Sequence, residues 1–88
     1  MLKERSEIAR AIGRRLAVAR EAAGLSQAQA AQALEVPQSR VAKVELGLRH
    51  LQFVEGLRLA DLYSVSPRYL DPNAPPVRLA TAHGAKAP

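Results

Sequence analysis

The sequence predicts an all-α protein, a compact bundle of five short helices. Hydrophobic residues make up 48% of the chain but aromatic residues only 3%, so the core must consist mainly of Leu, Val, Ile and Ala. These residues suit closely packed helices better than a sheet, which favours aromatic and β-branched side chains. Glycine and proline cluster at a few points, whereas an all-β chain would need a turn about every ten residues. The 88 residues allow one domain.

The first helix is predicted over residues 8–23. Its apolar side chains recur three or four positions apart, and its charged side chains lie on the other faces, as in an amphipathic helix. Ser6 is a suitable N-cap, and Gly24 stands where a left-handed C-cap belongs. These two residues set the expected limits of the helix.

Two shorter helices are predicted next, at residues 27–34 and 38–46. Ser26 is the expected N-cap of the first of them, with Gln29 at the capping-box position. Pro37 cannot continue that helix, but it fits the first turn of the next one, where its missing N–H does no harm. Helices of about two turns are unstable alone, so both must be held by their neighbours.

The chain is then expected to form a loop at residues 48–51, a fourth helix at residues 53–63 and a last short helix at residues 68–70. From residue 72 onward, proline and alanine dominate and leave little that could pack. We therefore expect one domain, residues 1–71, and a flexible tail, residues 72–88.

Composition and charge narrow the possible partners. The chain has no cysteine, which excludes disulfides and thiolate metal sites. No apolar run could serve as a signal peptide or reach the roughly 18 residues of a membrane span. Thirteen Lys and Arg against eight acidic residues give a net charge of +5, which suggests a polyanionic partner. Charge alone does not choose between nucleic acid and a membrane surface, so a motif must decide.

The two short helices, residues 27–34 and 38–46, have the features of a helix-turn-helix. In this motif the second helix crosses the first closely, which requires a small residue in the first helix and apolar residues that lock the pair. Ala31 can be the small residue. The apolar residues available for the lock are Leu34, Val36, Val41 and Val44.

Further short motifs surround this pair and cover about residues 8–71. They are Ile12-Gly-Arg-Arg-Leu16, Ala19-Arg20, Gly24-Leu-Ser-Gln27, Ala31, Leu34, Val36-Pro-Gln-Ser39, Val41, Val44-Glu45, Gly47, Arg49, Leu59-Ala60, Val65-Ser66 and Tyr69-Leu70. Together they resemble the lambda-repressor and Cro-type helix-turn-helix family, also called the XRE family. The resemblance implies a lambda repressor-like five-helix bundle that binds DNA.

The resemblance also implies which residues contact DNA. Helix 38–46 would be the recognition helix in the major groove, with Gln38, Ser39 and Arg40 reaching base edges. Gln27 would contact a phosphate and brace the recognition helix. The chemistry agrees, because glutamine can bind adenine through two hydrogen bonds and arginine can do the same to guanine.

Other basic residues are candidates for the DNA backbone. Lys43, one turn further along the recognition helix, can reach a phosphate or a base, and Arg49 in the following loop is placed for the backbone. Arg14 and Arg15 are weaker candidates, for which helix solubility is the better interpretation. The N–H groups that open helix 27–34 would supply a further anion site.

Two residues depart from the family pattern. Glu35 occupies the turn, where Gly is common, and would cost about 1 kcal/mol if its backbone is left-handed. Gly56 lies within the fourth predicted helix, where it costs about 0.5–1 kcal/mol relative to Ala. A close approach of another helix would explain Gly56.

The resemblance favours a sequence-specific transcriptional regulator, most often a repressor in this family, that binds an inverted repeat of double-stranded DNA as a homodimer. Tyr69, Leu70 and the tail are the expected dimer contact. The alternative is an antitoxin or accessory module whose tail, residues 72–88, binds a toxin or other protein partner. We expect a cytoplasmic, nucleoid-associated protein that does not bind membranes, because the apolar stripe of helix 8–23 is needed for the core.

Catalysis is not expected from this sequence. It shows no Ser-His-acid set, no paired carboxylates and no phosphate-binding loop. His50 and His83 stand without a cysteine or an acidic cluster, so no metal site is expected. The predictions therefore include no catalytic residue, cofactor or metal.

Overall fold

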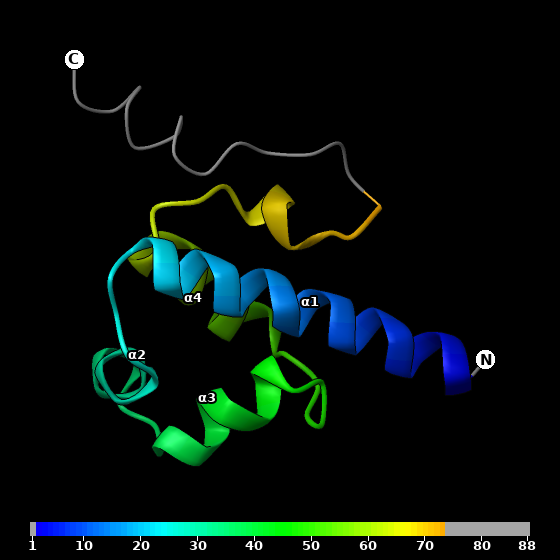
Figure 1. Cartoon of the computed structure of the whole chain (residues 1–88), viewed down its shortest axis with the longest axis horizontal. Coiled ribbons are helices and arrows are strands. Elements are labelled where there is room, and N and C mark those ends of the chain that lie inside the picture. Colours follow the sequence, from blue (N-terminus) through cyan, green and yellow to red (C-terminus); the bar gives the residue numbers. More distant parts are fainter. Residues whose placement is uncertain (1, 74–88) are drawn as a thin grey trace.

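The computed structural model describes the backbone of residues 2–73 and the side chains of residues 6–73. This part of the chain contains four α-helices, one short 3-10 helix and no strand (Figure 1). The all-α prediction is therefore confirmed, but the fifth helix is a single 3-10 turn. The elements are α1 (Leu2–Ala22), α2 (Gln27–Leu34), α3 (Gln38–Glu45), α4 (Phe53–Leu62) and η1 (Pro67–Leu70).

Helix α1 runs across the middle of the molecule and begins earlier than predicted. Its first helical residue is Leu2, so Ser6 lies inside the helix and is not its N-cap. The residues before Ser6 include good helix formers and no helix breaker, so the helix continues through them. The C-terminal prediction is confirmed, because Gly24 adopts a left-handed φ of 77°. Leu25 N–H then donates to the Arg20 carbonyl oxygen at 3.1 Å and closes the helix end.

Helices α2 and α3 form the predicted helix-turn-helix. Ser26 Oγ accepts from the Gln29 N–H at 3.0 Å, and Gln29 Oε1 accepts from the Ser26 N–H at 2.8 Å, which is a complete capping box. Glu35 ends α2 in the left-handed region, with φ 60° and ψ 45°. Pro37 is the N-cap residue of α3 and not part of its first turn. The turn between α2, which ends at Leu34, and α3, which begins at Gln38, is therefore only three residues long.

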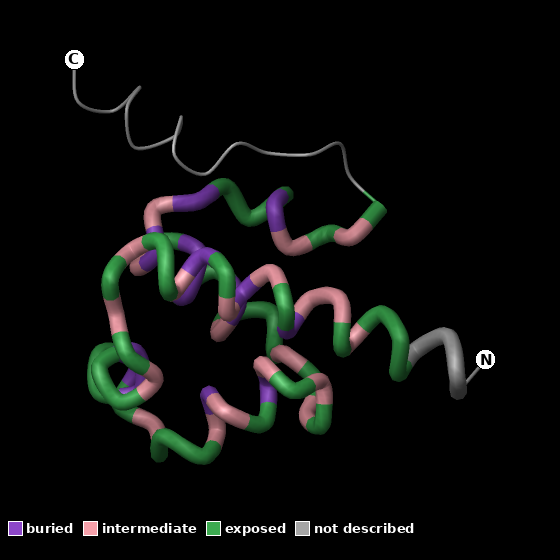
Figure 2. The backbone as a smooth tube through the Cα atoms, in the orientation of Figure 1, coloured by how far each residue is buried: buried purple, intermediate pink, exposed green. Residues whose placement is uncertain are grey.

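The core lies where α1, α2, α3 and α4 meet, and it includes Val65 before η1 and Tyr69 within it. Figure 2 marks the buried stretches of the chain in purple. Ala30 and Ala31 are both buried, so small side chains bring α2 close to its neighbours. Val41 and Val44 are buried beneath α3, as predicted. The buried core residues are Leu16, Ala19, Ala30, Ala31, Leu34, Val41, Val44, Leu59, Ala60, Tyr63, Val65 and Tyr69.

Helix α1 packs tightly against the C-terminal end of α3. A Cβ atom on Gly13 would lie only 2.5 Å from the Val44 carbonyl oxygen, closer than real Cβ contacts come. A Cβ on Gly47, which follows α3, would lie 2.8 Å from Arg10 Cα. Two glycines thus allow backbone to approach backbone, and this contact fixes the end of α3 on α1.

Gly56 in α4 has a different neighbour from the one expected. It is buried, and a Cβ there would lie 3.0 Å from Leu51 Cδ2 and 3.6 Å from Leu70 Cδ1. The closest neighbour is therefore the side chain of a loop residue and not the backbone of another helix. Across residues 2–73, no helix is long and apolar enough to span a bilayer.

Candidate nucleic-acid interface

The outer side of α3 presents polar side chains over an apolar inner side. Gln38, Ser39 and Lys43 are exposed, while Val41 and Val44 anchor the opposite side in the core. The burial of the two valines fixes the rotation of the helix about its axis, because residues three or four apart share a face. The helix therefore holds Gln38, Ser39 and Lys43 outward as a defined polar surface.

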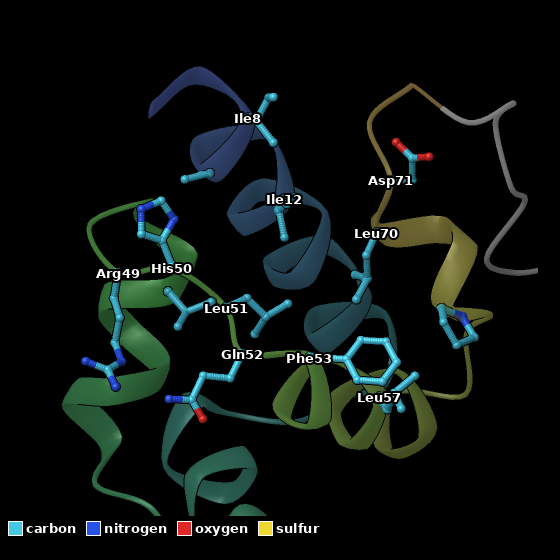
Figure 3. A pocket seen from close by; sticks show the side chains of 14 residues that line it. Ile8, Ile12, Arg49, His50, Leu51, Gln52, Phe53, Leu57, Leu70 and Asp71 are labelled. Carbon is cyan, nitrogen blue, oxygen red and sulfur yellow. The ribbon is translucent and has the colours of Figure 1, made fainter. Parts of the chain in front are cut away.

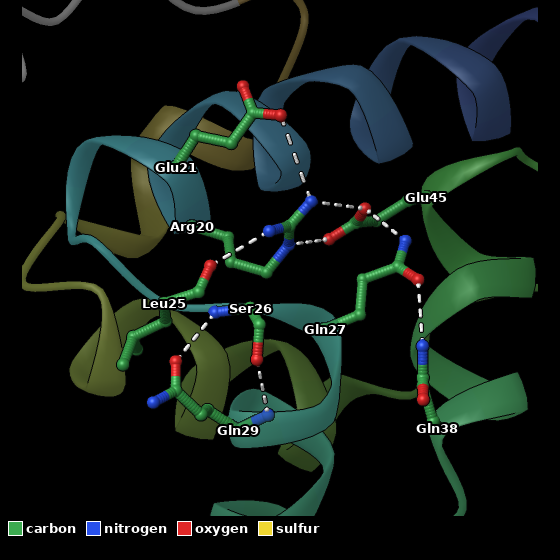
Figure 4. A network of polar contacts seen from close by, with 8 residues as sticks. All are labelled: Arg20, Glu21, Leu25, Ser26, Gln27, Gln29, Gln38 and Glu45. Carbon is green, nitrogen blue, oxygen red and sulfur yellow. Dashed lines mark hydrogen bonds and ion pairs between the residues drawn. The ribbon is translucent and has the colours of Figure 1, made fainter.

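A network of polar side chains holds this helix from behind (Figure 4). Arg20 of α1 binds the Glu45 carboxylate with two hydrogen bonds, Nε to Oε2 at 2.7 Å and Nη2 to Oε1 at 3.2 Å. Arg20 Nη1 also donates to the Leu25 carbonyl oxygen at 2.8 Å. The hydrogen bond to Glu45 raises the pKa of Arg20 above its ordinary value. Glu45 is thus an ion-pair residue that joins α3 to α1.

The same network continues to the first residue of α3. Gln27 Nε2 donates to Glu45 Oε1 at 2.9 Å, and Gln27 Oε1 accepts from Gln38 Nε2 at a long 3.5 Å. Glu45 therefore orients the amide of Gln27, and Gln27 in turn restrains Gln38. The bracing role that the family resemblance implied for Gln27 has this geometry.

Arg40 lies in the same helical turn as Gln38 and Ser39 but points elsewhere. Its guanidinium Nη1 forms an ion pair with Glu55 Oε2 of α4. This differs from the outward orientation that the sequence suggested. The prediction placed Arg40 beside the exposed residues, whereas the structure directs it into the space between α3 and α4.

The remaining predicted cations occupy different environments. Lys43 is exposed on α3, and Arg49 is half-buried in the loop that follows, with its Nε atom buried and without a hydrogen-bond partner. Arg15 belongs to the scaffold, because Nη1 donates to the Tyr69 carbonyl oxygen at 2.8 Å and the guanidinium lies 5.4 Å from the Tyr69 ring centroid. Arg14 is exposed. At the start of α2, the Gln29 N–H is already taken by the Ser26 cap.

A second surface feature is an apolar groove of about 550 Å³ between α1, α4 and η1 (Figure 3). Ile12 and Leu51 line its centre, and Phe53, Leu57 and Leu70 lie together at one end. Phe53 is 79% exposed although it is the largest apolar side chain in the groove. His50, exposed, lies at the rim and faces α1. Large exposed apolar patches are uncommon on monomeric proteins and mark interaction surfaces.

Sequence reasoning missed two of the residues that shape the interface. Glu55 gave no signal, because a single glutamate at the start of a helix is common and its partner lies 15 positions earlier in the chain. Gly13 was part of the recognised motif, but its role became visible only when α1 was placed against α3. A glycine within a strongly periodic helix could have signalled a close backbone approach.

Comparison with known proteins agrees with this geometry. The helix-turn-helix domain family matches residues 11–71 of the chain. Among solved structures, the restriction-modification controller protein C.AhdI from Aeromonas hydrophila is similar at 36% sequence identity and a TM-score of 0.66, with 73% of this chain and 96% of that chain covered. A comparison with curated proteins found no match.

Proposed function

The chain belongs to the helix-turn-helix domain family, and on this premise we propose that it is a sequence-specific DNA-binding transcriptional regulator that acts as a repressor on an inverted-repeat site. The observation that carries the proposal is the exposed polar surface of α3, held in place by the Arg20–Glu45–Gln27 network. The similarity to a restriction-modification controller protein supports a regulatory role. The net charge of +5 favours a polyanionic partner.

The DNA contacts divide into readout and positioning. Gln38 can bind adenine through two hydrogen bonds, and the Ser39 hydroxyl can donate to or accept from a base edge. Gln27, at the start of α2, is placed for a phosphate. Lys43 can reach a phosphate or a base, and Arg49 a phosphate, where they add affinity for any sequence.

The functional unit is a homodimer. One small module buries roughly 600–1,000 Å² on DNA, and pairing two half-sites supplies the further contacts that tight specific binding needs. We place the dimer contact on the groove and its exposed rim, which includes Phe53, Val54 and Leu57. Tyr69, which the sequence suggested for this contact, is only 7% exposed and packs in the core, while Leu70 lines the groove. The proposed dimer surface thus lies at the start of α4, earlier in the chain than the segment after α4 that the sequence suggested.

The antitoxin alternative rests on the tail. Most of that segment, residues 74–88, lies outside the described residues. Neither the family match nor the similar structure points to a toxin partner. The regulator is therefore the function we carry forward.

The test begins with selection of bound sites from a random DNA pool by the full chain. The wild-type protein should select an inverted repeat with half-sites about one helical turn apart. Gln38→Ala should cost about 1–3 kcal/mol on the selected site and relax preference at one base pair per half-site. Lys43→Ala should weaken binding to all sequences and reduce the salt slope by about 1 if Lys43 binds a phosphate.

Arg68→Ala is the matched control, because it removes one positive charge from an exposed position on η1. It should leave both the base preference and the salt slope close to wild type. The proposal fails if Gln38→Ala and Lys43→Ala bind every DNA as tightly as the wild-type protein does.

A further inference from the structure

Arg40 is the one basic residue in the first turn of α3 within the described part of the chain, yet it is engaged by another helix. Its side chain is 30% exposed and its partner carboxylate, Glu55, is 11% exposed. Gln38 and Ser39, its neighbours in sequence, are both exposed. The first turn of α3 therefore presents uncharged side chains outward and turns its guanidinium inward.

The surroundings favour this ion pair. Arg40 and Glu55 border a small apolar space next to Leu16, Leu34 and Leu59. Charges attract more strongly where water is largely excluded, and a buried carboxylate without its partner is costly. The second carboxylate oxygen, Glu55 Oε1, is buried and has no hydrogen-bond partner, so Arg40 supplies the main compensation for the charge of Glu55.

The ion pair changes what α3 can recognise. A free arginine in the first turn would favour guanine, because its guanidinium donates two hydrogen bonds to the O6 and N7 atoms. Bound to Glu55, Arg40 has Nη1 occupied and its positive charge offset. Among the cations of α3, this leaves Lys43 as the exposed one.

We propose that Glu55 is a specificity-determining residue, which withholds Arg40 from the DNA so that Gln38 and Ser39 alone read bases in the first turn of α3. The proposal rests on the function proposed above and goes beyond it. It assigns base preference to a side chain of α4 that does not itself contact DNA. Loss of the Glu55 charge would release Arg40 and add a guanine preference that the wild-type protein lacks.

The experiment is site selection from a random pool, followed by affinity measurements, with five variants of the full chain, two of them controls. Glu55→Gln removes the charge and keeps the shape, and Glu55→Ala also removes the acceptor. Both should favour sites with guanine opposite the first turn of α3 by about tenfold or more over the wild-type preference. In the double variant Glu55→Gln, Arg40→Ala, this new preference should disappear.

Two controls separate release of Arg40 from other effects. Asp61→Asn removes one negative charge from an exposed position on the same helix. It should raise affinity for all sequences by less than about threefold and leave base preference unchanged. Arg40→Ala alone should change affinity by a similar factor for every sequence and keep the wild-type base preference. Circular dichroism verifies that each variant is folded.

The proposal is overturned if Arg40→Ala abolishes a guanine preference already present in the wild-type protein, since Arg40 would then read DNA while Glu55 is present. It is also overturned if folded Glu55→Gln and Glu55→Ala select the wild-type site. In both cases the wild-type protein still binds DNA, so the proposed function stands. If the wild-type protein selects no site at all, the proposed function fails and this inference fails with it.

Discussion

At the scale of single residues, the position of α3 depends on side chains that lie on its inner side. Glu45 binds Arg20 and Gln27 at once, so one buried carboxylate connects α1, α2 and α3. Charge-assisted hydrogen bonds of this kind are short and directional. They fix the amide of Gln27, and through it the start of α3, before DNA arrives. Such preorganisation reduces the entropy lost on binding.

Tyr63 is a second buried polar residue with a measurable consequence. It is 1% exposed, and its hydroxyl has no hydrogen-bond partner. Burial, with a smaller contribution from Glu45, raises the pKa of Tyr63 from 10.0 to about 12. The neutral phenol is therefore favoured by the fold. Because the pKa is higher in the folded chain than in the unfolded chain, this stabilisation is complete below pH 10 and is lost as the pH rises toward about 12.

The free energy of unfolding of Tyr63→Phe should therefore fall less steeply with rising pH above 10 than that of the wild-type protein. A difference of two pKa units corresponds to about 2–3 kcal/mol of stability lost by the wild-type protein across this pH range. At pH 7 the variant should lie within about 1 kcal/mol of wild type, since it only removes an unpaired hydroxyl. Urea denaturation at pH 7, 9, 11 and 12 measures this. Parallel pH profiles for the two proteins would show that Tyr63 does not titrate differently in the folded state.

Residue identities that depend on local chemistry were predictable, and those that depend on distant packing were not. The spacing of Ser26 and Gln29 predicted the capping box that opens α2. The orientation of Arg40 could not be predicted, because it depends on where α4 places Glu55. The sequence pattern placed Arg40 on the outer face, but a long side chain can turn toward a buried partner.

At the scale of elements, the crossing of α1 and α3 decides how far α3 can project. Gly13 lies within a helix, where alanine is normally preferred by about 1 kcal/mol. Here a methyl group would overlap the backbone at Val44 and Glu45, which cannot yield without moving α3. The requirement for glycine comes from space and not from backbone conformation.

Gly13→Ala should consequently lower the free energy of unfolding by about 2–4 kcal/mol and weaken DNA binding, because α3 must shift. Gly24→Ala offers the contrast, since a Cβ there meets nothing within 4 Å but the backbone is left-handed. It should cost only about 1–2 kcal/mol and leave the affinity of the folded protein unchanged. Thermal unfolding and DNA titration measure both variants. Equal effects of the two substitutions on DNA affinity would contradict this explanation.

The boundaries of the helices were also predictable where they depend on signals within one turn. The capping box of Ser26 and Gln29 and the position of Pro37 predicted α2 to the residue, because these signals act within one turn. The predicted start of α1 was wrong, because a serine can lie inside a helix when the residues before it are also helix formers. The left-handed Glu35 confirms that the turn keeps its geometry without glycine, at a cost of about 1 kcal/mol.

At the scale of the whole molecule, the two surfaces have different proposed partners. The polar surface of α3 is proposed to bind DNA, and the apolar groove is proposed to bind a second copy of the chain. Phe53 and Val54 are 79% and 57% exposed, more than a monomer would favour for side chains of this size. Burial of such residues in a symmetric contact would stabilise a dimer by about 25 cal/mol per Å² of apolar surface, less the cost of association.

Phe53→Ser should shift the protein toward monomer and weaken binding to a full inverted repeat by about tenfold or more, while affinity for a single half-site changes little. Val18→Ser is the control, because Val18 is also half-exposed but lies outside the groove. Sedimentation velocity over a range of concentrations gives the oligomeric state. A wild-type protein that stays monomeric at all concentrations, or a Phe53→Ser protein that dimerises as wild type, would contradict the assignment of this surface.

The central assignment is the face of the molecule that meets DNA, and an NMR titration of the labelled protein with its selected site tests it most directly. The largest amide shift changes are expected at Gln27, from Gln38 to Lys43, and at Arg49. The amide shifts of the buried residues of α1 and α4 should change least. Shift changes concentrated on η1 and the exposed side of α1, with the amides of α3 unaffected, would contradict the assignment of α3 as the DNA-binding helix.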